Sequence, residues 1–178
     1  MKQYKIILSS KESEDFEMTI IAHEAILFSE LHQGIQSALN YDPLQMASFF
    51  MSDDNWNKNE EIALIDMEDK GEALLMDELN LSDKITQKGQ NFLYLFDFFS
   101  ERFFFMTIEN IEETTETRFT IDVKGEVPSQ INIDNESIDL LMQDIDAPSA
   151  ADAIEDFDEN YNDNDDISFE NIDDLEDY

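Results

Sequence analysis

Cysteine is absent from the 178 residues, and glycine and proline are scarce, with four and three copies. The lack of cysteine excludes disulfide bonds, thiolate metal sites and cysteine nucleophiles, and it fits a reducing compartment. With so few glycines the chain has no glycine-rich loop to cradle a phosphate, and neither P-loop, GxGxxG, GxSxG nor HExxH motifs occur. The sequence thus offers none of the common signatures of nucleotide-binding or hydrolytic sites.

Long apolar runs are also missing. No run reaches the roughly 18 residues that a membrane-spanning helix needs. The apolar stretch Ile6–Leu8 near the N-terminus is too short for the core of a signal peptide. We therefore expect a cytoplasmic protein.

Positive charge is scarce and unevenly placed. Ten Lys and Arg residues stand against 44 Asp and Glu residues, which gives a formal net charge of -34. All ten basic residues lie between Lys2 and Lys124, whereas residues 134–178 hold eighteen acidic residues and no basic one. Such a field repels nucleic-acid phosphates and anionic lipid head groups. We predict no direct nucleic-acid or membrane binding, and instead a basic protein partner.

One segment has the periodicity of a helix. Between Ser29 and Leu39 the apolar residues recur on one helical face, and Ser29 is placed to cap the N-terminus. Gly34 lowers the intrinsic stability of this helix, so we expect it to depend on packing.

Several segments alternate as strands do. Residues 91–99 and 102–111 are the most aromatic, and we predict a central hairpin buried on both faces, with a partner-binding surface as the alternative. A short helix capped by Ser82 is expected after residues 76–81. The other strands are expected near residues 4–8, 16–20, 46–51, 62–66 and 117–123. These patterns predict an α+β fold, a mostly antiparallel sheet with one principal helix (about 29–39) packed on it.

The composition changes near residue 130. We predict a domain over residues 1–130 and an acidic, largely disordered tail over 131–178, because its few apolar residues cannot offset the ordering entropy. The end of this tail could instead form a short amphipathic helix on a partner. Its candidate interaction residues are Phe169, Ile172, Leu175 and Tyr178.

The tail also contains alternating oxygen ligands. Asp156, Asp158 and Asn160 follow the spacing of an EF-hand loop. Tyr161 stands where that loop requires glycine, and Ile167 stands where it requires a bidentate glutamate. We therefore expect weak cation screening there, and no cofactor.

His32 and Asp97 are the candidate catalytic side chains. Asp97 lies between Phe96 and Phe98, and a carboxylate in apolar surroundings can have a raised pKa and act as an acid or base. The alternative, which we favour, is a structural role for His32 at the helix flank and a strand or turn role for Asp97.

Several segments resemble a known family in their order and spacing. Residues 31–41 (LHQGIQSALNY) are similar to its helix L-H-x-x-I-Q-x-A-F-G-W. Residues 79–83 (LNLSD) and 92–98 (FLYLFDF) are similar to its L-S-D segment and its Y-x-Y-D-F strand. Ile108-Glu109 falls where the family has L-E, and residues 125–128 (GEVP) lie near its G-x-x-P. Over residues 1 to about 130 the chain thus resembles the plasmid pRiA-type ORF-three-like family, which includes insertion-element passenger proteins, as a divergent member.

The departures from this pattern concern its most reactive residues. The family's Y-D-F-G-D-x-W-x-H falls on residues 96–104, where Gly, the second Asp, Trp and His are replaced by Phe99, Ser100, Arg102 and Phe104. Its H-L-H-E-F falls on residues 45–49 (QMASF), where both His are absent. The resemblance therefore implies an α+β fold more than an activity.

These observations predict a non-enzymatic protein-interaction module whose acidic tail engages a basic partner. The resemblance implies an association with plasmids or mobile elements. One alternative is a nucleic-acid mimic that occupies a basic protein. The other is a degenerate hydrolase-like or metal-dependent enzyme that uses Asp97, His32 and nearby carboxylates. The sequence leaves the oligomeric state open.

Overall fold

The computed structural model describes residues 1–66 and 73–131. The predicted disordered tail lies outside the described residues apart from Ile131, and the domain boundary near residue 130 stays a prediction. The candidate metal ligands and interaction residues that also lie outside are Asp156, Asp158, Asn160, Phe169, Ile172, Leu175 and Tyr178.

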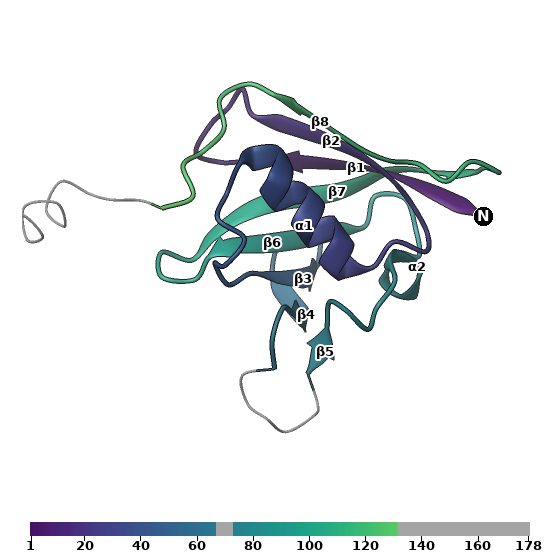
Figure 1. Ribbon diagram of the computed structural model, residues 1–178, viewed down its shortest axis with the longest axis horizontal. Coiled ribbons are helices and arrows are strands. Elements are labelled where there is room, and N and C mark those ends of the chain that lie inside the picture. The colour runs from purple at the N-terminus through teal and green to yellow at the C-terminus, as the bar shows by residue number, and fades with distance from the viewer. Residues whose placement is uncertain (67–72, 132–178) are drawn as a thin grey trace, which may run out of the picture. The chain divides into compact units, whose positions relative to one another are not determined.

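Within the described residues the fold is one eight-stranded sheet with a long helix, α1 (Phe28–Leu39), lying across one face (Figure 1). The strand order is β5-β4-β3-β6-β7-β1-β2-β8, and every neighbouring pair is antiparallel except β4 and β5. The strands are β1 (Lys2–Ser9), β2 (Glu17–His23), β3 (Ser48–Ser52), β4 (Lys58–Ala63), β5 (Leu74–Leu75), β6 (Asn91–Asp97), β7 (Arg102–Glu113) and β8 (Phe119–Lys124). This architecture confirms the predicted α+β fold with a mostly antiparallel sheet.

The first hairpin follows directly from its alternating sequence. Tyr4, Ile6 and Leu8 of β1 are fully buried, and Tyr4 and Ile6 lie opposite Ala22 and Ile20 of β2. Because residues two apart in a strand share a face, these side chains form one apolar surface beneath α1. The opposite edge of β1 pairs with β7, so β1 becomes a central strand of the sheet.

The helix ends differ from the predicted caps. Helix α1 begins at Phe28, so Ser29 lies inside the helix, and the carboxylate of Glu30 accepts the backbone N–H of Leu27 at 2.9 Å. The short helix α2 (Leu81–Lys84) is preceded by Asn80 rather than capped by Ser82. There the carboxylate of Asp83 accepts the backbone N–H of Asn80 at 2.7 Å. In both helices the capping acceptor comes from the third helical residue.

The central hairpin β6–β7 is buried on both faces only in its first strand. Five consecutive residues of β6, from Phe92 to Phe96, are buried. In β7, Phe104 and Met106 are buried, while Phe103 and Phe105 are partly exposed. The prediction that both strands are buried on both faces is therefore confirmed for β6 and wrong for β7. No helix within residues 1–66 and 73–131 is long and apolar enough to cross a membrane.

Candidate functional site

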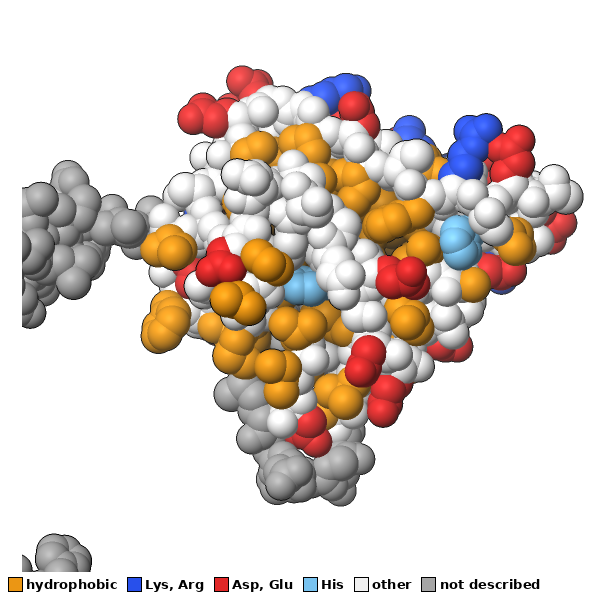
Figure 2. Space-filling view, in the orientation of Figure 1, with side chains coloured by type: hydrophobic (Ala, Val, Ile, Leu, Met, Phe, Trp, Pro, Cys, Tyr) orange, Lys and Arg blue, Asp and Glu red, His pale blue; other side chains and the backbone are white. Residues whose placement is uncertain are grey.

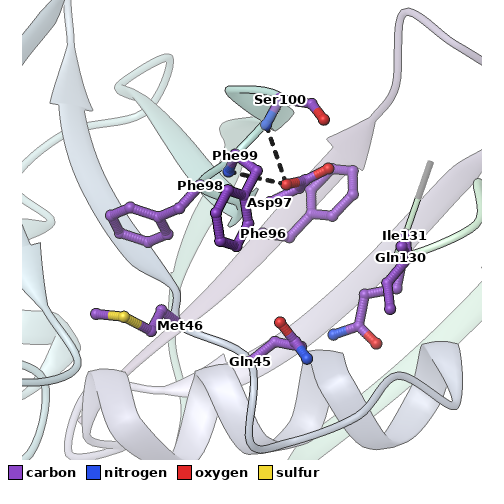
Figure 3. Close-up of a pocket in the computed structure, with 9 residues that line it drawn as sticks. All are labelled: Gln45, Met46, Phe96, Asp97, Phe98, Phe99, Ser100, Gln130 and Ile131. Atoms are coloured by element: carbon purple, nitrogen blue, oxygen red, sulfur yellow. Dashed lines mark hydrogen bonds between the residues drawn. The ribbon is translucent and has the colours of Figure 1, made fainter. Parts of the chain in front are cut away.

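A pocket of about 580 Å³ lies at the end of the β6–β7 hairpin (Figure 3). Three segments far apart in the sequence form it: the connection from α1 to β3, the hairpin loop, and the segment that follows β8. Its lining residues are Gln45, Met46, Phe96, Asp97, Phe98, Phe99, Ser100, Gln130 and Ile131. The lining is mostly apolar and aromatic, with a few polar groups, which is the usual make-up of a ligand pocket.

Asp97 shapes the hairpin loop at the pocket wall. One of its carboxylate oxygens accepts the backbone N–H groups of Phe99 and Ser100 at 3.0 and 3.1 Å (Figure 3). The loop closes with Glu101 in the left-handed region, at φ 48°. Asp97 therefore caps the turn, which is the structural role that the sequence left open for it.

The charge state of Asp97 follows from burial and from its hydrogen bonds. Burial acts to raise its pKa, but the hydrogen bonds from Ser100, Phe99 and Arg102 outweigh burial and leave the pKa below its ordinary value. The raised pKa that the enzymatic alternative would need is therefore not found, because the amides of the turn stabilise the carboxylate more than the neighbouring rings disfavour it. Asp97 is an anion at neutral pH.

Arg102 connects the pocket wall to two other segments. Its side chain is only 8% exposed, and its guanidinium forms an ion pair with Glu12 and a longer one with Asp97 at 3.5 Å. The same group donates hydrogen bonds to the carbonyl oxygens of Ser129 at 2.7 Å and Gln130 at 3.1 Å. Its pKa is raised, first by the hydrogen bond with Glu12. Arg102 thus fixes the segment that carries Gln130 and Ile131 beside the hairpin loop.

A chain of buried polar groups runs from α1 toward the pocket. The Tyr94 hydroxyl lies 2.7 Å from His32 Nδ1 and accepts the side-chain N–H of Gln36 at 2.6 Å. Gln36 in turn accepts a hydrogen bond from the Gln130 amide at 3.3 Å. Since Tyr94 already accepts from Gln36, its own O–H is available to donate to His32 Nδ1. Burial lowers the pKa of His32, so this histidine is neutral at neutral pH.

Among the residues that the structure describes, His32 and Asp97 share no hydrogen-bond partner, and they are linked only indirectly, through Gln130. The partner of His32 is Tyr94, which precedes Asp97 by three residues along β6, a span of about 10 Å in a strand. Asp97 is bonded to its own turn and to Arg102. In the described part of the chain, no group of three or more His, Asp or Glu side chains is arranged to hold a metal ion. The structure does not bring the two candidate catalytic residues together at the pocket.

Exposed apolar side chains gather around the pocket. Phe99 is 100% exposed, Phe98 is 37% exposed and Ile131 is 56% exposed. Figure 2 shows hydrophobic side chains concentrated at the end of the domain where the hairpin loop and the α1–β3 connection meet. Contiguous exposed apolar surface of this kind marks interaction sites on proteins.

Sequence reasoning singled out Asp97 but missed Gln45, Met46, Gln130 and Ile131 as neighbours of the same pocket. One signal was available in the departures from the family pattern. Gln45, Phe99 and Ser100 stand where that pattern has His, Gly and Asp, and all three line the pocket. Three of the six departures therefore lie at the pocket, whereas those at residues 47, 102 and 104 are not among its lining residues.

Comparison with known proteins identifies the family of the chain and a solved structure with a similar fold. A family model described as plasmid pRiA4b ORF-3-like protein matches residues 2–165, which extends past the last motif at residues 125–128. No curated protein matches the chain. The chain is similar to the crystal structure of a protein of unknown function from Methanosarcina mazei Go1, with a TM-score of 0.58 and 19% sequence identity. That similarity covers 91% of this chain and 94% of the other, and it shows a common fold. Because the family model covers most of the sequence, the chain belongs to the plasmid pRiA4b ORF-3-like protein family.

Proposed function

We propose that this chain is a protein-interaction module that binds a basic protein partner at the hairpin-end pocket. The observation that carries the proposal is the wholly exposed Phe99 at the pocket, in a chain with a formal net charge of -34. Contiguous exposed apolar side chains mark interaction surfaces, and aromatic side chains commonly anchor interfaces.

Charge supports a basic partner over a neutral or acidic one. A large negative potential attracts basic proteins over several ångströms and speeds their association, while it repels acidic ones. The eighteen acidic residues of 134–178 add to this attraction. The exposed apolar side chains then supply the short-range contact that long-range charge alone does not give.

The two alternative functions, a nucleic-acid mimic and a degenerate enzyme, require different features. A nucleic-acid mimic would depend on charge alone, so its binding should be indifferent to the ring of Phe99. An enzyme using His32 and Asp97 would require both side chains within hydrogen-bond reach of one substrate. Each of them is instead engaged by other residues, and no feature of the pocket favours that reading.

The proposal is tested with the full chain, isotopically labelled, by NMR titration with hexalysine at low salt. We expect shifts of the amide signals of Phe99, Ser100 and Ile131, which are lost as NaCl is added because the attraction is screened. Phe99→Ala should weaken binding at least about fivefold, since a truncated anchor loses about 1 kcal/mol or more.

A matched control is Ile65→Ala, which truncates another exposed apolar side chain (57% exposed) that does not line the pocket. Hexaglutamate should cause no shifts. If hexalysine leaves the pocket amides unchanged, the proposed function is wrong. If it shifts them equally in the wild type and in Phe99→Ala, binding depends on charge alone, as a nucleic-acid mimic requires.

A further inference from the structure

We infer that the group which enters this pocket is an arginine guanidinium, stacked on the rings of Phe98 and Phe99 beside Asp97. This inference rests on the proposed function and names the part of the basic partner that the pocket recognises. A guanidinium is planar, so it can lie flat on an aromatic ring and donate hydrogen bonds from its edge at the same time.

Other rings of the same hairpin already bind cations. Three of them each hold a cation of the chain itself, at 4.3 to 4.8 Å from the ring centroid. Among the described residues no such cation lies over Phe98 or Phe99. The occupied rings pair as Phe105 with Lys11, Phe103 with Lys58 and Phe96 with Arg102. Of the three phenylalanine rings that line the pocket, Phe96 already holds Arg102, whereas Phe98 and Phe99 are left to receive a cation from outside.

The side chains next to the pocket carry a net negative charge. Arg102 is paired with two carboxylates, those of Glu12 and Asp97, so this cluster carries a surplus of one negative charge. Asp97 lines the pocket and stays ionised, and no lysine or arginine is among the lining residues. A cationic group entering the pocket therefore meets a net negative wall.

Two glutamine side chains at the pocket floor offer hydrogen-bonding groups. Gln45 contributes its side-chain amide from the α1–β3 connection, and Gln130 contributes its amide from the opposite segment (Figure 3). Gln130 is already engaged with Gln36 and Asp42, whereas the Gln45 carbonyl oxygen is placed to accept an N–H at the pocket. The five N–H groups of a guanidinium suit such a mixed aromatic and acceptor lining.

The experiment compares hexaarginine, hexalysine and hexacitrulline, the last being a neutral analogue of similar shape, on the full chain by NMR titration. We expect hexaarginine to bind at least about threefold more tightly than hexalysine, and hexacitrulline to cause no shift. Phe99→Leu keeps an apolar side chain but removes the ring face, and it should abolish the preference for hexaarginine. Phe99→Tyr keeps the ring face and should retain the preference.

Phe119→Leu is the control, because it removes another partly exposed ring (37% exposed) that lies on β8 and does not line the pocket. It should leave both affinities unchanged. Equal affinity for hexaarginine and hexalysine, or a preference that survives in Phe99→Leu, would overturn the inference while the proposed function stands. Failure of both basic peptides to shift the pocket amides would overturn both the inference and the proposed function. Since Phe99 is wholly exposed, its variants are expected to fold normally.

Discussion

The ring of Phe119 on β8 lies directly against Gly34 in the middle of α1. A Cβ atom at Gly34 would stand 2.6 Å from Phe119 Cζ and 2.9 Å from Ile121 Cδ1. The missing side chain therefore lets α1 approach the last strand of the sheet closely. This contact explains why a residue that disfavours helix is tolerated at the centre of the principal helix, and it agrees with the expectation that α1 depends on packing.

Gly34→Ala should lower the free energy of unfolding by about 1 kcal/mol. Alanine gains roughly 1 kcal/mol in helix propensity, but overpacking against the two side chains of β8 costs about 1–3 kcal/mol. Urea unfolding followed by circular dichroism measures the difference. In a Phe119→Ala background the ring that the new methyl group meets is gone, so the same substitution should be neutral or stabilising. An equal loss in both backgrounds would show that the contact with Phe119 is not the cause.

Gly125 and Gly89 form a matched pair for a second prediction. Both have positive φ, +77° and +83°, but a Cβ at Gly125 would stand 1.9 Å from the Asp15 backbone oxygen, whereas Gly89 has no atom within 4 Å. Gly89→Ala should therefore cost only the left-handed backbone strain, about 1–2 kcal/mol. Gly125→Ala must also move the backbone and should cost more than about 3 kcal/mol. Equal losses in urea unfolding would contradict this difference.

The principal helix and most strands could be predicted because each rests on local periodicity, but β4 (Lys58–Ala63) was expected at residues 62–66 and β5 (Leu74–Leu75) was not predicted. Tyr4, Ile6 and Leu8 alternate in the sequence and are all fully buried in the sheet. The caps were missed because the acceptor came from Glu30, inside the helix, rather than from Ser29 at its expected start. A capping residue identified by type alone does not reveal which side chain reaches the free N–H groups.

The pocket could not be predicted because its walls come from distant parts of the chain. Arg102 reaches Glu12, 90 residues away, and Ser129, 27 residues away, and these separations leave no local pattern. The raised pKa that the enzymatic alternative for Asp97 would need is absent for a related reason. Its neighbours in sequence are phenylalanines, but its nearest polar contacts are the backbone N–H groups of the turn that it closes.

Arg102→Met should destabilise the fold by about 3 kcal/mol. The substitution keeps a long apolar stem but removes the guanidinium, which leaves the largely buried Asp97 carboxylate without its ion-pair partner. Glu12→Gln should cost clearly less, because the Glu12 side chain is 39% exposed and water replaces part of the lost interaction. Arg102→Lys should fall between the wild type and Arg102→Met, since an ammonium keeps the positive charge but has only three donors and lacks the planar fork of the guanidinium. Thermal unfolding of the three variants tests this order, and full stability in Arg102→Lys would contradict it.

Asp53 should control the position of Trp56, the single tryptophan of the chain. The carboxylate of Asp53 accepts the backbone N–H groups of Asn55 and Asn57, both at 2.9 Å. Trp56 adopts a left-handed φ of 64° within this turn. The indole then meets the ring of Phe105 edge-on, with centroids 5.0 Å apart. Asp53→Ala should release this conformation and reduce the tryptophan signal in near-ultraviolet circular dichroism. Asp53→Asn keeps one acceptor oxygen and should retain more of that signal.

His32 should make the stability of the fold depend on pH. Burial lowers its pKa in the folded state, whereas in the unfolded chain the pKa is near its ordinary value of about 6.5. The unfolded state therefore binds more protons between these two values. The stability associated with neutral His32 is fully present above about pH 6.5 and declines as the pH falls toward the folded pKa.

His32→Asn separates this effect from the titration of the many carboxylates. Asparagine offers an oxygen to the Tyr94 hydroxyl but carries no titrating group, so the variant should be less stable than the wild type near pH 7.5 because of imperfect packing. Its deficit in unfolding free energy should shrink as the pH is lowered to 5, since only the wild type is destabilised by keeping His32 neutral in the folded state. Urea unfolding across this range gives the difference at each pH. A deficit that is constant from pH 7.5 to 5 would mean that His32 takes up its proton equally easily in the folded and unfolded chains.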